Sequence, residues 1–456
     1  MKTTDFSSLN LTPNMLKNLD ELGYKEMTPI QAEALPLILK GEDLIAQAKT
    51  GSGKTAAFGI GLLSKLDVKK FRVQSLILCP TRELADQVAK ELRRIARFEH
   101  NIKILTLCGG VAFGPQFGSL KHQAHIIVGT PGRVLKHLKK ESLKLEDMDT
   151  LVLDEADRML DMGFIEEIQE VISFASSKRQ TLLFSATYPD EIIDLSKSIQ
   201  KDAKIVKTKS LEIKNKITER FYEVQTHSKV QTLVNIFSNF KPKNVIVFCN
   251  TKVECDELAN SLNAKDIDAL ALHGDMEQYD RNDVLVQFAN NSCCVLVATD
   301  VAARGLDIKE LSMVVNYDLP HSKEIYTHRI GRTARAGAEG MAFTFYETYA
   351  NLEVDEYKND TRIFEDISSL KKVIDFRMRP EFTTLVIEGG KKDKLRAGDI
   401  LGALTGEIGL DGKKIGKIDI YERQSYVAID AKYIDNVLEK LQKSKIKKRK
   451  FSTWIL

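Results

Sequence analysis

A glycine-rich stretch with a lysine near the N-terminus has the composition of a phosphate-binding loop. It reads Ala-Lys-Thr-Gly-Ser-Gly-Lys-Thr, and it stands between an apolar run that predicts a strand and a segment that predicts a helix. Backbone amides can surround phosphate oxygens there, while Lys54 meets their charge and the Thr55 hydroxyl binds Mg²⁺. Glycine is usual at the first position of such a loop, where this chain has Ala48. The strand before the loop and the helix after it nevertheless favour a nucleotide site over a chance surface turn. The predicted nucleotide-binding residues of this stretch are Ala48, Lys49, Thr50, Gly51, Ser52, Gly53, Lys54 and Thr55.

A second apolar run ends in the acidic sequence Asp154-Glu155-Ala156-Asp157. Asp154 can coordinate Mg²⁺, directly or through water, and Glu155 can polarise an attacking water molecule. A metabolic kinase would need only the aspartate, so the adjacent glutamate favours hydrolysis of ATP over transfer of its phosphoryl group. Placement for the helix dipole could explain Asp157 alone, but it explains the four-residue pattern poorly. We therefore predict Asp154 and Thr55 as metal ligands, and Glu155, Asp154 and Lys54 as catalytic residues.

The elements that must position these residues follow a repeated plan. Short apolar runs alternate with longer amphipathic segments, which is typical of parallel strands covered by helices on both faces. The expected strands are 43–46, 75–78, 125–128, 150–153 and 180–184 in the first half, and 244–248, 269–272, 293–297, 313–316 and 341–345 in the second. Glycine, threonine, aspartate or arginine follows almost every strand at once, so these residues should share the carboxyl edge of a sheet, where ligands bind. The fold class is therefore α/β, with two doubly wound parallel-sheet domains.

The domain plan has five parts. We expect a first α/β domain over 1–207, a Lys-rich linker over 208–217, a second α/β domain over 218–365, a connecting segment over 366–382 that contains a helix, and a small α+β domain over 383–456. From residue 383 onward the chain carries sixteen Lys and Arg against ten Asp and Glu, although the net charge of the whole chain is only +3. A basic unit on a near-neutral body favours contact with phosphate.

Composition excludes several classes of protein. Charged residues make up 29% of the chain and the mean hydropathy is −0.22, and glycines interrupt the longest charge-free stretch, 104–120. A membrane protein is therefore not expected, and a start without the apolar core of a signal peptide favours the cytoplasm. The six cysteines show no Cys-x-x-Cys spacing, and His122 and His125 have no ligand partner nearby in the sequence, so structural roles are preferred over zinc or redox sites.

The chain resembles a DEAD-box RNA helicase over residues 6–346, and the two motifs above carry this resemblance. Gln31, in the sequence Thr-Pro-Ile-Gln, resembles the glutamine that reads adenine in that family, with Tyr24 placed to stack on the ring and Phe6 as the upstream aromatic. The Ser-Ala-Thr sequence at 185–187 resembles the motif that couples the nucleotide state to RNA. The resemblance implies coupling roles for Ser185, Thr187, Asp157 and His328.

The second domain has no Gly-Lys-Thr sequence, so it should complete the first domain's site rather than hold another nucleotide. The run from His328 to Arg335 resembles the family motif in which Arg332 and Arg335 neutralise charge on the γ-phosphate. Such arginines increase the rate of hydrolysis by a factor of ~10³–10⁵. Ala334 replaces the commoner glycine of this motif, and Asp307 matches the family's ribose contact.

The same resemblance implies contacts to the RNA backbone. The matching positions are Thr81, Arg82, Gly110, Thr130, Pro131, Gly132 and Arg133 in the first domain, and Thr251, Gln278, Arg281, Thr299, Asp300 and Arg304 in the second. Taken singly, each could also be a solvated turn residue. Amides, threonine hydroxyls and arginines suit sugar and phosphate better than base edges, so we expect these domains to bind RNA without sequence preference. The family discriminates RNA from DNA through 2′-hydroxyls and opens short duplexes locally.

The C-terminal domain has a predicted β-α-β-β-α-β order, which indicates an RNA-recognition fold. Its central strands offer only Tyr426 for stacking on bases, so the Lys- and Gly-rich loops are better candidates for RNA contact, namely Lys391, Lys392, Lys394 and Arg396. The stretch 389–404 is similar to the DbpA subfamily. This implies recognition of a 23S ribosomal RNA hairpin and a role in assembly of the large (50S) ribosomal subunit. The basic run 445–450 is a solvated strand end or a further phosphate contact.

The predicted protein is thus a monomeric ATP-dependent RNA helicase with ATP and Mg²⁺ as cofactors and RNA as partner. Two other functions stay open. A DNA-directed helicase would share the two-domain architecture without needing Gln31, and an ATP-gated RNA clamp would carry the same motifs without unwinding.

Overall fold

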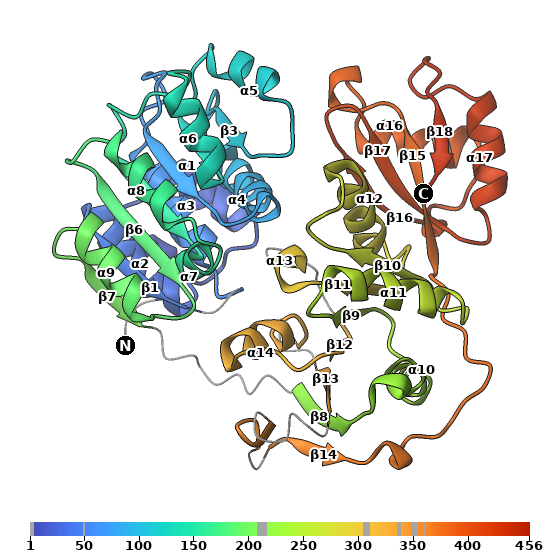
Figure 1. Ribbon diagram of the computed structural model, residues 1–456. Helices are drawn as coiled ribbons and strands as arrows, with labels where there is room; N and C mark the ends of the chain where they lie inside the picture. Colours follow the sequence, from blue (N-terminus) through green and yellow to red (C-terminus); the bar gives the residue numbers. More distant parts are fainter. Residues whose placement is uncertain are drawn as a thin grey trace. The chain divides into compact units, whose positions relative to one another are not determined.

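The computed structural model describes residues 4–48, 51–207, 217–303, 311–334, 339–347, 354–358 and 361–456 (Figure 1). These residues form two compact units, one up to Lys207 and one from Ile217 onward. The first unit is an α/β lobe, and the second contains another α/β lobe together with the C-terminal domain. Among the described residues, no helix is long and apolar enough to cross a membrane.

The first lobe is built on a seven-stranded parallel sheet. Its strands are β1 (Leu44–Gln47), β2 (Ser75–Leu78), β3 (Ile104–Leu107), β4 (Ile126–Gly129), β5 (Thr150–Asp154), β6 (Gln180–Ser185) and β7 (Lys204–Lys207), in the order β3-β4-β2-β5-β6-β1-β7. Its helices are α1 (Pro13–Glu21), α2 (Pro29–Lys40), α3 (Lys54–Lys65), α4 (Arg82–Ile95), α5 (Phe113–Leu120), α6 (Pro131–Lys139), α7 (Ala156–Asp161), α8 (Ile165–Ser173) and α9 (Asp190–Ile199). One apolar core joins the sheet to α1–α4 and another joins it to α6–α9, so both faces are covered.

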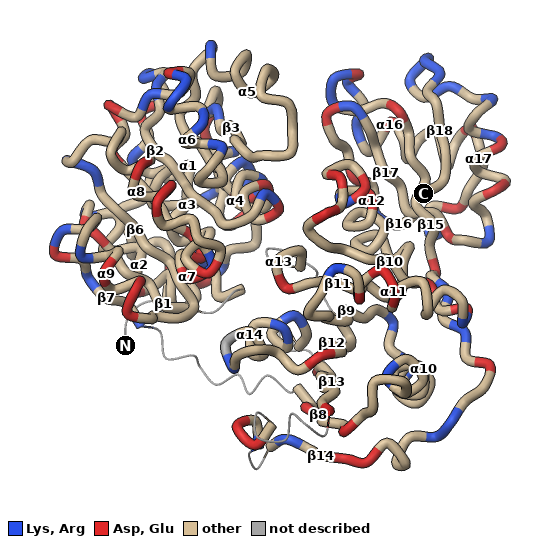
Figure 2. Tube along the Cα trace, in the orientation of Figure 1, with Lys and Arg blue, Asp and Glu red and all other residues tan. Residues whose placement is uncertain are grey.

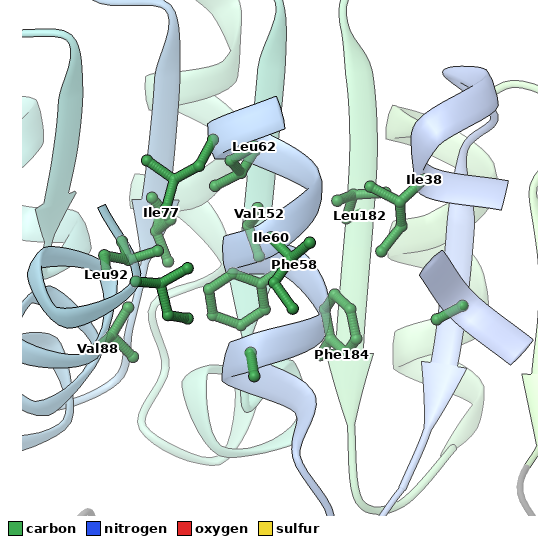
Figure 3. Packing of buried hydrophobic residues seen from close by; sticks show 14 of the residues in the cluster. Ile38, Phe58, Ile60, Leu62, Ile77, Val88, Leu92, Val152, Leu182 and Phe184 are labelled. Atoms are coloured by element: carbon green, nitrogen blue, oxygen red, sulfur yellow. The ribbon is translucent and has the colours of Figure 1, made fainter. Parts of the chain in front are cut away.

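Helix α3 lies at the centre of the first core and begins at the phosphate-binding loop. Figure 3 shows Phe58 of α3 beside Phe184 of β6, with 5.3 Å between the ring centroids. Two glycines let this helix approach its neighbours, because a Cβ on Gly61 would lie 2.3 Å from Ile38 of α2 and one on Gly59 would lie 2.9 Å from Leu92 of α4. This packing fixes the first turn of α3, from which Lys54 projects.

The second lobe repeats the plan. Its parallel strands are β8 (Ile217–Glu223), β9 (Val245–Phe248), β10 (Ala269–Leu272), β11 (Val295–Ala298), β12 (Met313–Asn316), β13 (Gly340–Tyr346) and β14 (Ile363–Glu365), in the order β10-β11-β9-β12-β13-β8-β14. Its helices are α10 (Lys229–Phe240), α11 (Lys252–Asn263), α12 (Gln278–Ala289), α13 (Asp300–Ala303) and α14 (Lys323–Ile330). The two-lobe α/β prediction is therefore confirmed.

The C-terminal domain has the predicted β-α-β-β-α-β order. It contains β15 (Phe382–Ile387), α16 (Ala397–Gly402, extended by a π-helical turn over Ala403–Glu407), β16 (Ile415–Ile420), β17 (Ser425–Asp430), α17 (Ile434–Lys443) and β18 (Thr453–Ile455). The strands form an antiparallel sheet in the order β16-β17-β15-β18. Leu385 and Val427 face the domain's own helices, whereas Val386 and Tyr426 on the opposite face pack against Val286 of α12 in the second lobe.

The predicted helix over 367–380 is wrong. Only a 3₁₀ turn forms, over Ile367–Ser369, and the chain that follows runs along α10. The N–H of Lys371 donates to Asn239 Oδ1 at 3.2 Å, and its carbonyl accepts from Asn239 Nδ2 at 3.0 Å. The N–H of Val373 donates to Asn235 Oδ1 at 3.4 Å. Side chains of α10 thus satisfy the backbone groups that a helix would have paired internally.

Candidate nucleotide and RNA site

The phosphate-binding loop connects β1 to α3, as its sequence predicts. Gly51 and Gly53 have φ angles of +82° and +95°, and a Cβ on Gly53 would lie 2.6 Å from Gln31 Nε2. Both the left-handed backbone and the close approach therefore require glycine. Lys49 and Thr50 lie outside the described residues, and Ala48 is buried at the end of β1.

Gln31 lies against this loop and is 1% exposed. Its Oε1 accepts a hydrogen bond from the Thr28 N–H at 2.9 Å, and its Nε2 donates to the Gly53 carbonyl at 3.2 Å. The same side chain therefore closes the first turn of α2 and contacts the phosphate-binding loop. The structure brings these two predicted regions together.

Tyr24 is held in place through its hydroxyl. The hydroxyl donates to Glu91 and accepts from Arg94 Nη2 at 2.9 Å, both on α4, and its ring packs edge-on against Phe6 with 6.3 Å between centroids. Burial, with the Glu91 carboxylate beside it, raises the pKa of Tyr24 to about 12. The Tyr24 side chain is therefore neutral and anchored at its hydroxyl. These contacts fix the orientation of its ring.

The acidic motif lies at the carboxyl end of β5. Asp154 is 2% exposed, and burial raises its pKa to about 6 although Lys54 lowers it. Glu155 has φ 53° and ψ 52°, a left-handed conformation that is rare for a residue with a side chain, and Arg158 Nη1 lies 2.8 Å from its Oε2. Such backbone strain clusters at functional sites.

Asp157 connects this motif to the end of β6. Its Oδ2 accepts hydrogen bonds from the Thr187 N–H and the Thr187 hydroxyl, each at 2.9 Å, and from the Ala186 N–H at 3.2 Å. Burial alone would raise the pKa of Asp157, but the Thr187 hydrogen bonds hold it below its ordinary value. Ser185 donates from its hydroxyl to the Thr187 carbonyl at 2.7 Å. The two predicted motifs are therefore one hydrogen-bonded unit.

The residues around the loop fit a nucleotide with a bound cation. Lys54 Nζ, Ser52 Oγ and Asp154 Oδ1 are buried, and none has a hydrogen-bond partner within the described chain. Burying a charge or a hydroxyl without a partner is costly, so such atoms indicate a ligand that supplies the partners. Phosphate oxygens complement Lys54 and Ser52, and Mg²⁺ complements a carboxylate oxygen of Asp154.

The predicted RNA contacts of the first lobe gather at the starts of α4 and α6. Thr81 caps α4 by accepting from the Leu84 N–H at 3.3 Å. Gly110 has φ +70°, and a Cβ there would collide with the Arg82 guanidinium, so these two predicted residues are in contact. Arg133 donates to Val111 O at 3.0 Å and to Gln116 at 2.9 Å, which ties α6 to α5. Thr130, Pro131 and Gly132 form the first turn of α6 and its cap.

Comparisons with known proteins match most of the chain. Residues 28–195 match the DEAD/DEAH box helicase family, 228–337 the helicase conserved C-terminal domain and 384–454 the DbpA RNA binding domain. The ATP-dependent RNA helicase DbpA of Escherichia coli (strain K12) is 51% identical over 455 residues, which cover 97% of this chain and 98% of that protein. The chain is a DEAD-box RNA helicase of the DbpA subfamily. It is therefore an RNA-stimulated ATPase that binds ATP and RNA.

A further relative and two solved structures match three quarters or more of the chain. The CshA helicase of Bacillus cereus is 46% identical over 343 residues, which cover 75% of this chain and 65% of that protein. The structure of Dbp5 from S. cerevisiae bound to RNA and ADP BeF3 aligns with a TM-score of 0.72 and 30% identity, over 80% of this chain and 96% of that one. The structure of Mss116p bound to ssRNA and AMP-PNP aligns with a TM-score of 0.71 and 28% identity, over 80% of each chain.

The second lobe of this helicase places its predicted residues at the ends of β9 and β11 and on α12. Thr251 caps α11 by accepting from the Glu254 N–H at 3.2 Å, and Thr299 follows β11. Gln278 and Arg281 lie on α12, where Arg281 Nη2 donates to Ala302 O at 3.0 Å. Arg332 is 5% exposed and His328 is half-buried. Arg304, Asp307 and Arg335 lie outside the described residues.

Arg329 is a residue whose structural role the sequence did not predict. It is 2% exposed and lies three residues before Arg332. Its Nε and Nη2 donate to the two carboxylate oxygens of Asp300 at 2.7 Å; Nη2 also donates to Asn250 Oδ1 at 2.9 Å, and Nη1 donates to the Asp318 carbonyl at 3.0 Å. Asp300, which matched an RNA-contact motif, therefore uses its carboxylate to hold α14 in place.

A buried lysine extends this network. Lys229 is 6% exposed, and its Nζ lies 2.9 Å from Asp318 Oδ1 and 3.2 Å from Glu347 Oε1. Burial would lower the pKa of Lys229, but the two carboxylates raise it, so it carries its charge in the interior. Asp318 Oδ2 also accepts from the Asn250 N–H at 3.0 Å. No sequence pattern marked Lys229; a single charged residue at the start of an otherwise uncharged helix was the available signal.

The predicted RNA-binding loop of the C-terminal domain is pinned to the turn between β16 and β17. The N–H of Lys391 donates to Tyr421 O at 2.9 Å and that of Lys392 donates to Glu422 O at 3.0 Å. A Cβ on Gly390 would lie 2.4 Å from Tyr421 O, so the approach requires glycine. The basic side chains of the loop, those of Lys391, Lys392, Lys394 and Arg396, are exposed. Figure 2 shows Lys and Arg gathered at this end of the domain.

Proposed function

We propose that this helicase remodels 23S ribosomal RNA during assembly of the large ribosomal subunit, with its C-terminal domain holding a hairpin while the two lobes act on RNA nearby. The observation that carries the proposal is the fixed loop that presents Lys391 and Lys392 to solvent from a domain of the DbpA RNA binding family. The lobes span 1–207 and 218–365, the linkers 208–217 and 366–382, and the RNA-binding domain 383–456. A ribosomal target would place the protein in the cytoplasm, and we expect it to act as a monomer.

The roles of the nucleotide-site residues follow from their surroundings. Lys54 neutralises phosphate charge, because its buried ammonium needs an anionic partner. Thr55 and Asp154 hold Mg²⁺, which supplies charge stabilisation at the transferring phosphoryl group. Gln31 and Tyr24 read adenine, and Asp307 contacts the ribose. Ala48, Lys49, Thr50, Gly51, Ser52 and Gly53 line the phosphates with backbone amides.

Glu155 orients and deprotonates the attacking water. Its left-handed backbone turns the side chain away from the course of β5, and Arg158 at 2.8 Å orients the carboxylate. A general base must be ionised and positioned before the reaction begins. Arg332 and Arg335 neutralise the negative charge of the γ-phosphate in the transition state.

Asp157, Ser185, Thr187 and His328 transmit the nucleotide state to RNA. The support for this role is the set of hydrogen bonds that joins Asp157 to Thr187 and Ser185 to the Thr187 carbonyl. A change at Glu155 alters the start of α7, and Asp157 carries that change to the end of β6. The RNA backbone is held by the threonines, glycines and arginines at the carboxyl ends of the strands in both lobes.

Substitution of Lys391, Lys392 and Lys394 together with alanine tests the target. Binding of a 23S fragment that contains the hairpin should weaken to the affinity of a scrambled fragment, while ATPase activity without RNA stays at the parent rate. Replacement of the exposed Lys443, which pairs with Glu439 on α17, is the matched control. An unchanged preference for the hairpin in the triple variant would refute the targeting role of the loop.

A further inference from the structure

The sheet face on which RNA-recognition folds stack bases is covered in this protein. Tyr426, the single aromatic of the central strands β15 and β17 apart from Phe382 at the strand start, is 4% exposed. Its hydroxyl donates to Asp283 Oδ1 at 3.0 Å, and its ring packs with Val386 against Val286 of α12. Asn290 Nδ2, at the end of α12, donates to Thr384 Oγ1 at 3.2 Å. Bases therefore cannot reach this face while it is packed against α12.

Two tyrosine rings stay exposed at the edge of this interface. Tyr279 on α12 is 52% exposed and Tyr421 after β16 is 40% exposed. Gln424 connects Tyr279 to Tyr426, since its Nε2 donates to the Tyr279 hydroxyl at 3.0 Å and its Oε1 lies 3.0 Å from the Tyr426 hydroxyl. Tyr421 packs edge-on against Tyr426, with 5.4 Å between ring centroids. Tyr421 is thus held by the buried ring of Tyr426, and Tyr279 is linked to the same residue through Gln424.

The edge lies between two sets of proposed RNA contacts. On the lobe side, Gln278 and Arg281 share the first turns of α12 with Tyr279. On the domain side, the N–H of Lys391 is hydrogen-bonded to the carbonyl of Tyr421 itself. Each ring is therefore adjacent to one of the two sets of proposed contacts, Tyr279 to that on α12 and Tyr421 to that on the basic loop.

The charges around the rings favour a base over a phosphate. Glu277, Asp280 and Glu422 are exposed near them in the sequence and offset the charge of Arg281 and Arg423, so phosphate meets no net attraction there. A neutral base needs no such attraction, and an aromatic face binds any base by stacking. We propose that Tyr279 and Tyr421 form a stacking site for one unpaired RNA base, located between the hairpin held by the C-terminal domain and the strand held by α12. This inference deepens the proposed function and rests on it.

The test uses the full chain and two RNAs, the bare hairpin and the same hairpin with single-stranded extensions in which 2-aminopurine replaces one base at a time. Stacking on tyrosine quenches the probe, so one position should lose fluorescence on binding. Tyr279→Ala and Tyr421→Ala should each weaken binding of the extended RNA about tenfold, leave the bare hairpin unaffected and abolish the quenching. Phenylalanine at either position should retain parent affinity, because stacking needs only the ring.

Tyr433→Ala is the matched control, because Tyr433 is 39% exposed in the same domain and has Lys414 5.4 Å from its ring. It should bind both RNAs like the parent. Parent-like affinity of the two alanine variants for the extended RNA, or equal losses in the alanine and phenylalanine variants, would overturn the stacking site. A bare hairpin that binds no better than a scrambled one would instead overturn the proposed target.

Discussion

The carboxylate of Asp157 accepts hydrogen bonds from both the backbone N–H and the hydroxyl of Thr187, each at 2.9 Å. Asp157 belongs to the acidic motif at the end of β5, and Thr187 follows the end of β6. Hydrogen bonds to an ionised group contribute more than neutral ones, about 1.5–3 kcal/mol each. The two motifs therefore move together. A substitution at Thr187 should separate ATP hydrolysis from the unwinding of RNA.

Removing the Thr187 hydroxyl should uncouple the two activities. In Thr187→Ala we expect RNA-stimulated ATPase to stay within about threefold of the parent, while strand separation per ATP falls about tenfold, because one of three hydrogen bonds to Asp157 is lost. Simultaneous ATPase and strand-displacement assays give this ratio. Thr187→Ser keeps the hydroxyl and should behave like the parent. A ratio that is unchanged in the alanine variant would contradict the coupling role.

Glu155→Gln should stop turnover without preventing binding. The amide has the size of the carboxylate but cannot accept a proton from water, so kcat should fall by about 10²–10⁴ while the dissociation constants of ATP and RNA change little. Single-turnover hydrolysis and fluorescent-nucleotide titration measure the two effects. Lys54→Ala serves as the contrast, because it should weaken ATP binding itself. Hydrolysis by the glutamine variant at the parent rate would show that Glu155 is not the base.

His137 should make the first lobe sensitive to acid. This buried ring stacks on Phe113 at 4.1 Å between centroids, and burial lowers its pKa to about 4. Because the folded pKa lies below the unfolded one, its contribution to stability is complete above about pH 6.5 and is lost as the pH falls towards 4. The free energy of unfolding of this lobe should thus be about 1 kcal/mol lower at pH 5 than at pH 7.5 once solvent screening is allowed for.

Urea unfolding of the first lobe at the two pH values measures this difference. His137→Gln should be less stable at both but should lose most of the pH dependence, whereas His122→Gln, at an exposed position, should retain it. Equal pH dependence in His137→Gln and the parent would assign the effect to another group.

Lys229→Met should destabilise the second lobe and lower kcat together. The substitution leaves Asp318 buried without its cation, and breaking a buried pair costs about 3–5 kcal/mol. Asp318 and Arg329 both form hydrogen bonds with Asn250. A disturbed Asp318 should therefore also displace α14 and Arg332. Lys323→Met, which removes an exposed ion pair with Glu356, should change the free energy of unfolding little.

Combining Lys229→Met with Asp318→Asn should recover part of the lost stability, since the second change removes the unpaired charge. Denaturant unfolding of the single and double variants gives the coupling energy. Additive losses would show that the two side chains act independently.

The sequence predicted the architecture where its signals were local. Apolar runs followed by glycine, threonine or aspartate located ten of the parallel strands and their functional ends, because strand burial and the carboxyl edge of a sheet both leave local marks. Strands β7 and β14 were missed, since short edge strands carry exposed or charged residues such as Lys204 and Glu365 rather than an apolar run. β3 was hidden inside a charge-free stretch, and β8 was missed because its side chains alternate with charged ones.

Long-range pairing set the limits of prediction. The connecting segment was expected to be helical because nothing local indicates that Asn235 and Asn239 of α10 satisfy its backbone. The partners of Arg329 come from three separate strand ends, and those of Lys229 lie 89 and more residues away. Asp157 could be read as a helix-dipole residue from the sequence, whereas its three hydrogen bonds depend on how β5 and β6 pair.

The central claim is that the C-terminal domain directs an RNA-dependent ATPase to a ribosomal RNA hairpin. The most direct test is the Mg²⁺-ATPase rate without nucleic acid and with generic RNA, duplex DNA, or a 23S fragment that contains the hairpin, all at equal nucleotide concentration. We expect strong stimulation by the hairpin fragment and little by the others. Equal stimulation by every RNA would contradict the targeting role, and equal stimulation by DNA would contradict the RNA specificity of the lobes.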